Sequence, residues 1–205
     1  IARDPEVRRA GGSVVKVLGT ACGLGIEGSG WVSSGGLVVT NAHVVAGEED
    51  TTVQLRGTGP RLDAEPVVLD AHNDVAVLRV PALAGVRSLP LRENAPVGTS
   101  AAVLGFPENG PFDVRPARLG ATTTVLTQDA YGRGPIRRRV TALRGLVRSG
   151  NSGGPMVDGR GRVVGTIFAA TRGGRERGGF AVPASVVRRD LGRARGRVDT
   201  GPCAG

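Results

Sequence analysis

The 205-residue sequence is short of aromatic side chains and has no long hydrophobic run. Aromatic residues make up 3% of the chain, so Val, Leu, Ile and Ala must fill most of the core. No aromatics alternate with the arginines, which argues against a stacking platform for single-stranded nucleic acid, and we expect no nucleic-acid partner. No apolar run approaches the ~18 residues needed to span a bilayer.

A signal peptide and an initiating Met are also missing, because the sequence begins at Ile1. This start is typical of a mature form or a fragment from which an upstream anchor or targeting segment can have been removed. The chain itself is therefore expected to be soluble.

Lysine is nearly absent, since Lys16 is the single lysine among 27 basic residues. The formal net charge of +9 is uneven: residues 1–102 carry 9 basic and 11 acidic side chains, and residues 103–205 carry 18 and 7. The simplest interpretation of so much arginine is a GC-rich coding bias. The alternative is attraction to an anionic surface such as cell-wall polymer, lipid head groups or nucleic acid.

Only two cysteines occur, Cys22 and Cys203, near opposite ends of the chain. They are either free thiols or a bridge that closes almost the whole chain. A bridge would stabilise the fold by about 4–5 kcal/mol in the chain-entropy model and would indicate an oxidising, extracytoplasmic compartment. The spacing alone leaves both possibilities open.

Glycine and proline, by contrast, are abundant, with 34 and 13 residues, and the many turns they predict favour an all-β fold. A turn-rich stretch at 81–98 separates two halves, predicted as domains 1–95 and 96–205. Apolar and alternating patterns predict strands, a glycine-rich turn at 23–30, a helical lead-in at 5–12 and an amphipathic helix at 183–195. The predicted strands are 13–19, 30–33, 37–40, 51–55, 65–69, 75–80, 101–105, 115–126, 138–143, 163–169 and 179–182.

The stretch Ser149–Pro155 places Ser152 between glycines on a tight loop. Glycines permit backbone angles that let successive N–H groups turn toward one point, a geometry that stabilises an oxyanion. A serine nucleophile still needs a base and an orienting carboxylate.

The base must be His43 or His72, the only histidines. His43 follows a buried-looking strand, whereas His72 lies in a turn and is interpreted as a solvated loop residue. The acid candidate is Asp74, at the start of an apolar run, and its rival Asp70 suits the turn better. In the triad chemistry Ser152 attacks a carbonyl, His43 moves the proton and Asp74 orients His43.

The N–H groups of Gly150 and Ser152 would form the oxyanion hole. This chemistry requires neither a metal ion nor another cofactor, and we expect none.

Four segments, Thr40–Val45, Asp74–Leu78, Gly150–Pro155 and Gly179–Pro183, resemble the signature segments of chymotrypsin-fold (trypsin-like) serine proteases, in the right order across about residues 13–190. The resemblance is greatest to the bacterial high-temperature-requirement branch. More narrowly, the chain resembles the actinobacterial membrane-anchored periplasmic serine proteases fused to a colicin-V-production-like domain. The segments 116–118 and 201–203 support that narrower resemblance.

The resemblance implies two perpendicular six-stranded antiparallel β-barrels and a short C-terminal helix, with His43, Asp74 and Ser152 in the cleft between them. It also implies a disulfide between Cys22 and Cys203. The expected function is an extracytoplasmic serine endopeptidase, periplasmic or extracellular, which cleaves proteins or peptides in envelope stress or protein processing. The expected form is a monomer, tethered to a membrane in the full-length protein.

Two alternatives stay open. One is an inactive protease-fold binding module, and the other is an enzyme gated by the redox state of Cys22 and Cys203. Departures from the family also matter, because Asn151 stands where digestive proteases have an aspartate that pairs with a new N-terminal amine. Activation by insertion of Ile1 is therefore disfavoured. A PDZ-like domain is absent from this sequence.

The resemblance also places Leu146 at the base of the primary substrate pocket and Phe168 and Ala170 in one wall. This apolar floor predicts a small or medium apolar residue before the cleaved bond.

Overall fold

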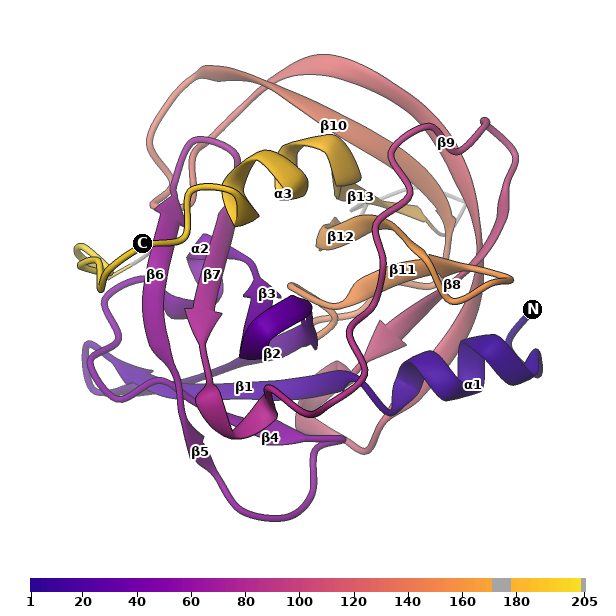
Figure 1. The fold of residues 1–205 in the computed structure, drawn as a ribbon. Coiled ribbons are helices and arrows are strands. Elements are labelled where there is room, and N and C mark those ends of the chain that lie inside the picture. Colours follow the sequence, from indigo (N-terminus) through magenta and orange to yellow (C-terminus); the bar gives the residue numbers. More distant parts are fainter. Residues whose placement is uncertain (171–177, 204–205) are drawn as a thin grey trace.

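Two β-sheets, one from each half of the chain, make up the computed structural model (Figure 1). The structure describes residues 1–170 and 178–203. Strands of the first sheet come from residues 14–79 and those of the second from 100–183. The predicted all-β class, the two curled sheets and the short C-terminal helix are confirmed.

The first sheet has seven antiparallel strands in the order β5-β4-β1-β2-β3-β7-β6. Six strands were expected in this sheet. The additional one is the two-residue strand β5, which pairs with β4. The bounds are β1 Val14–Ala21, β2 Leu24–Val32, β3 Leu37–Thr40, β4 Thr52–Leu55, β5 Leu62–Asp63, β6 Glu65–Asp70 and β7 Val75–Arg79.

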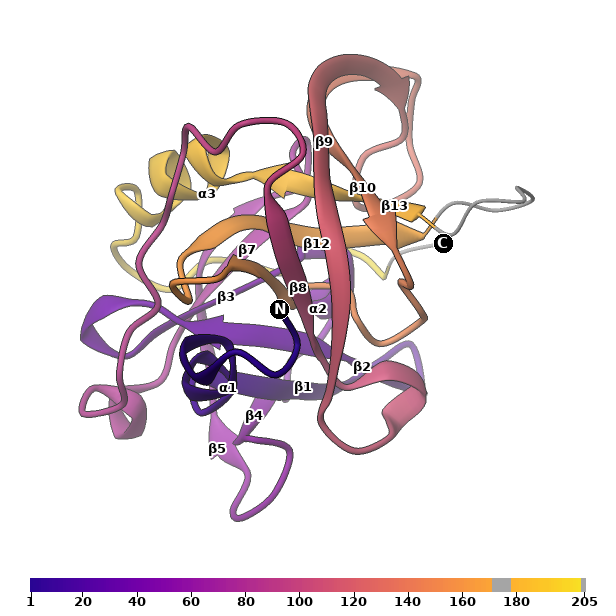
Figure 2. The same cartoon turned by 90° about the vertical axis from the view of Figure 1, so that its right-hand side faces the viewer.

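The second sheet closes into a six-stranded barrel in the order β10-β13-β12-β11-β8-β9. Its longest strands, β9 and β10, rise beyond the rest of the barrel (Figure 2). The bounds are β8 Ser100–Gly105, β9 Asp113–Thr127, β10 Ile136–Gly145, β11 Pro155–Asp158, β12 Val163–Ala170 and β13 Gly178–Pro183.

The predicted glycine-rich turn at 23–30 is wrong, because β2 runs through this region. Every residue of β2 from Leu24 to Trp31 faces a residue of β1. The turn is limited to Cys22 and Gly23, whose φ angles of 49° and 76° are left-handed and suit a two-residue hairpin. Pairing with β1 satisfies the backbone groups, and this outweighs the low strand propensity of glycine.

Three short α-helices complete the fold. In α1, Pro5–Gly11, the Asp4 side chain caps the first turn by accepting the Glu6 N–H at 2.9 Å. The single turn α2, Ala42–Val45, follows β3 directly and carries His43. The helix α3, Ala184–Leu191, follows β13 and packs against strands of both sheets.

The two sheets share one hydrophobic core, to which α1 and α3 also contribute. Trp31 of β2 is fully buried there, and its Nε1 donates to Thr166 Oγ1 of β12 at 3.2 Å. Fully buried valines from both halves dominate the rest, as the low aromatic content predicts. The core members are Val7, Ala10, Val14, Trp31, Val39, Val75, Leu89, Ala102, Leu104, Phe106, Val157, Val163, Val182, Val186 and Val187.

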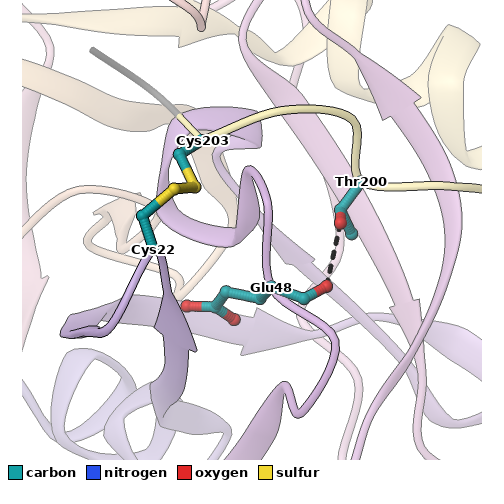
Figure 3. The surroundings of a disulfide bond; sticks show 4 residues. All are labelled: Cys22, Glu48, Thr200 and Cys203. Atoms are coloured by element: carbon teal, nitrogen blue, oxygen red, sulfur yellow. Dashed lines mark hydrogen bonds between the residues drawn. A yellow bond between two sulfur atoms is a disulfide. The ribbon is translucent and has the colours of Figure 1, made fainter.

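A disulfide joins Cys22, at the tip of the β1–β2 hairpin, to Cys203 in the C-terminal tail (Figure 3). The pairing implied by the family resemblance is confirmed. The tail is also held beside the bridge by Thr200, whose Oγ1 donates to the backbone carbonyl of Glu48 at 2.8 Å.

The carboxyl group of Glu48 is buried close to this bridge (Figure 3). Its Oε2 accepts a hydrogen bond from Thr51 Oγ1 at 2.7 Å, and its Oε1 has no partner among the described residues. Burial, helped by the charge of Asp50 and opposed by the Thr51 hydrogen bond, raises the pKa of Glu48 to about 7.

Breaking the bridge with Cys22→Ser should lower the free energy of unfolding by about 4–5 kcal/mol, because the bridge constrains almost the whole unfolded chain. Denaturant unfolding of the variant and of the reduced wild-type chain measures this loss. An unchanged midpoint in both would contradict a stabilising bridge.

Stability should also fall as the pH rises through the titration of Glu48. The unfolded chain releases this proton near pH 4.5, whereas the folded chain holds it to about pH 7. The free energy of unfolding therefore decreases between these values, by up to about 3 kcal/mol. Denaturant unfolding at pH 5 and pH 8 should show a smaller decrease in Glu48→Gln than in the control Glu49→Gln, an exposed neighbour. Equal decreases in the two variants would refute this assignment.

Candidate active site

His43 and Asp74 are brought together where β3 and β7 pair, with Thr40 facing Ala76. Two hydrogen bonds join them: the His43 backbone N–H donates to Asp74 Oδ1 at 2.9 Å, and His43 Nδ1 lies 2.8 Å from Asp74 Oδ2. Asp74 is 3% exposed and has a left-handed φ of 60°. Asn41 Nδ2 also donates to the Asp74 carbonyl at 2.8 Å, so the carboxylate has a fixed orientation.

The charge of Asp74 controls the protonation of His43. Burial alone would lower the pKa of His43, but the negative charge and hydrogen bond of Asp74 outweigh it, so the pKa is raised above 6.5. The positive charge of Arg138 opposes this rise. With Asp74 on Nδ1, the other ring nitrogen, Nε2, is directed away from the carboxylate and is the atom that can accept a proton.

The rival residues have structural contacts. Asp70 accepts from the backbone N–H of Asn73 at 2.9 Å and from its side chain at 2.8 Å. His72 is exposed, and its Nε2 lies 2.9 Å from the carbonyl oxygen of Arg137. Asp70 is the last residue of β6 and His72 lies in the turn that follows it, close to the interpretation from the sequence.

The nucleophile loop packs against the sheet that carries His43. The Ser29 N–H on β2 donates to the Ser152 carbonyl at 2.8 Å. A Cβ on Gly153 would lie 2.1 Å from the Ser29 carbonyl oxygen and 3.1 Å from Thr40 Cα, so only glycine fits there. Ser152 Oγ lies 3.5 Å from the carbonyl oxygen of Phe168, and no hydrogen bond to His43 occurs within the described part of the chain. Such bonds are often loose without substrate.

Two peptide groups in this loop are held through their carbonyl oxygens, which leaves the N–H groups of Gly150 and Ser152 available. The Ser149 carbonyl accepts from the Glu108 N–H at 2.8 Å, and the Asn151 carbonyl accepts from the Gly154 N–H at 2.9 Å. In a trans peptide the N–H points opposite to the carbonyl, so the Gly150 and Ser152 N–H groups point away from these anchors. Neither N–H has a hydrogen-bond partner among the described residues.

Asn151 and Ser29 fix the loop in this arrangement. Asn151 is buried, and its Oδ1 accepts from the Arg148 N–H at 2.9 Å. Ser29 Oγ donates to the Gly150 carbonyl at 2.6 Å and accepts from the Phe106 N–H at 2.9 Å. The amide of Asn151 thus acts within its own loop, and no N-terminal amine is involved. Ser29 was missed by sequence reasoning, since a serine in a glycine-rich segment has no distinguishing pattern.

The predicted substrate pocket is only partly described. Leu146 is half-buried just after β10, and Phe168 is half-buried on β12, where its ring stacks with Phe180 at 6.2 Å between centroids. The side chain of Ala170 lies outside the described residues. The pocket therefore stays a prediction.

A groove of about 1410 Å³ lies elsewhere, beside the disulfide, and none of His43, Asp74 and Ser152 lines it. The candidate active site is therefore defined by the hydrogen bonds around His43, Asp74 and Ser152, and this groove is not part of it. Within residues 1–170 and 178–203, no group of three or more His, Cys, Asp or Glu side chains is placed to hold a metal ion. No helix of the same residues has the length and apolar character needed to cross a membrane.

The model of the trypsin-like peptidase domain family matches residues 28–165. The chain belongs to the trypsin-like serine proteases. It is 38% identical over 208 residues to the serine protease Rv3671c of Mycobacterium tuberculosis, covering 99% of this chain and 52% of that protein. It is also 37% identical over 167 residues to a probable periplasmic DegP-like serine endoprotease of Halomonas elongata, covering 78% and 33%. This trypsin-like chain thus spans about half the length of the Mycobacterium relative.

Solved structures show the same fold. The active form of the Rv3671c protease has a TM-score of 0.92 at 36% identity, with 100% of this chain and 91% of that chain covered. Its inactive form has a TM-score of 0.81 at 34% identity, with 95% of each chain covered. The trypsin-like chain described here is therefore more similar to the active form.

Removing the Ser29 hydroxyl should impair the nucleophile loop. Ser29→Ala leaves the Phe106 N–H and the Gly150 carbonyl unpaired in the interior, a loss of about 2 kcal/mol or more. We expect kcat to fall about tenfold, because the Gly150 peptide is no longer fixed. The matched control is Ser13→Ala, a buried serine that donates to the Arg87 carbonyl at 2.6 Å. Ser13→Ala should lower the free energy of unfolding but leave kcat unchanged. Equal kcat in both variants would overturn this role.

Proposed function

We propose that the chain is a serine endopeptidase that hydrolyses peptide bonds through an acyl-enzyme formed on Ser152, with His43 as the base and Asp74 as its orienting acid. The main support is the 2.8 Å contact between His43 Nδ1 and Asp74 Oδ2, next to a loop with two unpaired N–H groups. The greater similarity to the active form of a related protease supports the same conclusion.

In the first half of the reaction, Ser152 Oγ attacks the substrate carbonyl carbon while His43 Nε2 takes the hydroxyl proton. The carbonyl oxygen becomes an oxyanion and accepts hydrogen bonds from the Gly150 and Ser152 N–H groups. In enzymes where this has been measured, losing one such donor costs about 3–4 kcal/mol of transition-state stabilisation. His43 then gives its proton to the leaving amine, and the peptide bond breaks.

In the second half, water attacks the acyl-enzyme and His43 accepts the water proton. The new oxyanion uses the same two N–H groups, and its collapse breaks the ester and returns the proton to Ser152 Oγ. Asp74 orients His43 and stabilises the imidazolium that forms twice in the cycle.

The proposed setting is outside the cytoplasm, with folded or misfolded envelope proteins as substrates. The disulfide between Cys22 and Cys203 supports an oxidising compartment, and a similar protein is named as periplasmic. Both sheets supply the active site, His43 and Asp74 from the first and Ser152 from the second, so we propose that they act as one protease domain. A monomeric state and a membrane tether stay predictions.

Labelling by a fluorophosphonate probe tests the proposal directly. The wild-type chain should be labelled, and Ser152→Ala should not. Asp74→Asn should keep the fold but lower kcat about 10⁴-fold, the loss seen when a triad aspartate can no longer hold the correct tautomer. The measurements are probe incorporation and hydrolysis of a fluorogenic peptide. A folded wild-type chain that is neither labelled nor active would favour an inactive binding module.

A further inference from the structure

One arginine of the second half points into the protein beside the active site. In the β10 run Arg137, Arg138 and Arg139, neighbouring side chains point to opposite faces of the strand. Arg137 and Arg139 are exposed, whereas Arg138 is only 7% exposed. Its guanidinium lies over the ring of Phe168, whose carbonyl oxygen is 3.5 Å from Ser152 Oγ, and its charge acts on both His43 and Asp74.

Arg138 has no hydrogen bond and no ion pair among the described residues. Its Nε and Nη1 are buried without a partner, and its Nη2, equally unpartnered, retains contact with solvent. The guanidinium lies over the Phe168 ring, with its central carbon 4.3 Å from the ring centroid. Burying an ionised group without a hydrogen-bonded counter-charge is unfavourable, and Nη2, the guanidinium nitrogen that keeps contact with solvent, is the donor open to an acceptor from outside the chain.

The carboxylates nearest in electrostatic terms are already engaged. Asp74 is paired with His43, and Asp70 is bound to Asn73. Asp129, the third, accepts from two N–H groups of its own turn through Oδ1. Arg138 is therefore under the electrostatic influence of three carboxylates, but it forms no ion pair with any of them.

The substrate backbone has a natural place next to this charge. On one side of β12, pairing with β11 ends at Thr166, whereas β13 pairs with the opposite side as far as Ala170. Among the described residues, no strand pairs with this edge of β12 from Phe168 to Ala170, where a substrate strand could add. The residue before the cleaved bond would lie beside Ser152, near the Phe168 carbonyl. Side chains of a strand alternate, so the preceding residue would face the opposite way, toward His43 and Arg138.

We infer that Arg138 is a specificity-determining residue, whose guanidinium binds an acidic side chain in the second residue before the cleaved bond. This inference rests on the proposed peptidase function. A guanidinium binds a carboxylate in a two-pronged geometry and stacks on an aromatic ring at the same time. Phe168 would hold the guanidinium plane while the carboxylate accepts hydrogen bonds from the solvent-accessible Nη2.

The test compares peptides that differ only in charge at this position. An internally quenched parent peptide, found by profiling a peptide library with the wild-type chain, is made with Glu or Gln, and with Asp or Asn, as the second residue before the cleaved bond. We expect kcat/KM to favour the acid over its amide by about tenfold or more. Arg138→Met should abolish the preference and Arg138→Lys should retain part of it. The control Arg139→Met, on the same strand but exposed, should leave it unchanged.

Three results would overturn the inference: no preference for acid over amide in the wild-type chain, an unchanged preference in Arg138→Met, or an equal loss for both peptides. The last would indicate a purely structural role. Fluorophosphonate labelling and thermal unfolding of every variant establish that the nucleophile and the fold are intact. A wild-type chain that is labelled but shows no acid preference refutes only the role of Arg138. A chain that is not labelled refutes the peptidase function itself.

Discussion

The carboxylate of Asp74 fixes both the position and the chemistry of His43, and the site is arranged around this contact. One oxygen accepts the backbone N–H of His43 and the other contacts the ring, so the helical turn α2 and the imidazole are oriented by a single buried group. The contact exists because β3 and β7 are neighbours in the first sheet. A shift of one residue in their register would turn Asp74 to the opposite face and leave His43 without an orienting acid.

The second sheet depends on the first through Ser29. The Ser29 carbonyl accepts a hydrogen bond from Thr40 Oγ1. Its N–H donates to the Ser152 carbonyl, and its hydroxyl donates to the Gly150 carbonyl. The loop that carries Ser152 is therefore built on the sheet that carries His43. The relative position of base and nucleophile is set by hydrogen bonds across the two halves as well as by the shared core.

The proposed triad could be named from the sequence because its members lie in short, ordered segments with distinctive residue types: a histidine after a buried strand, an aspartate before an apolar run, and a serine between glycines. The contacts that hold these residues in place could not be predicted from the sequence. Ser29, the Glu108 N–H on the Ser149 carbonyl, and the inward-facing Arg138 each depend on a strand or loop distant in sequence. Only the end of strand β2 was predicted, at 30–33; its first part, from Leu24, was assigned to a turn, because glycine has weak local preferences and the pairing with β1 decides its conformation.

Some of the arginines also gain a structural meaning that composition could not provide, among them Arg92 in the first half of the chain and Arg162 in the second. Arg92 and Arg162 bind the buried Asp158, whose oxygens also accept two backbone N–H groups of its turn. Burial favours the neutral form of this carboxyl, but the hydrogen bonds from Arg162 and its neighbours outweigh it and lower the pKa of Asp158. A coding bias can supply arginines, yet several of them hold the barrel together.

The bond between Cys22 and Cys203 also determines what a cut in the backbone can do to this protease. The bridge ties the tip of a hairpin in the first sheet to the end of the segment that follows the second. A single backbone cut in any loop between these two residues therefore leaves the fragments covalently connected. The two halves of the active site cannot separate by diffusion after such a cut, and a nicked molecule keeps the means to reassemble.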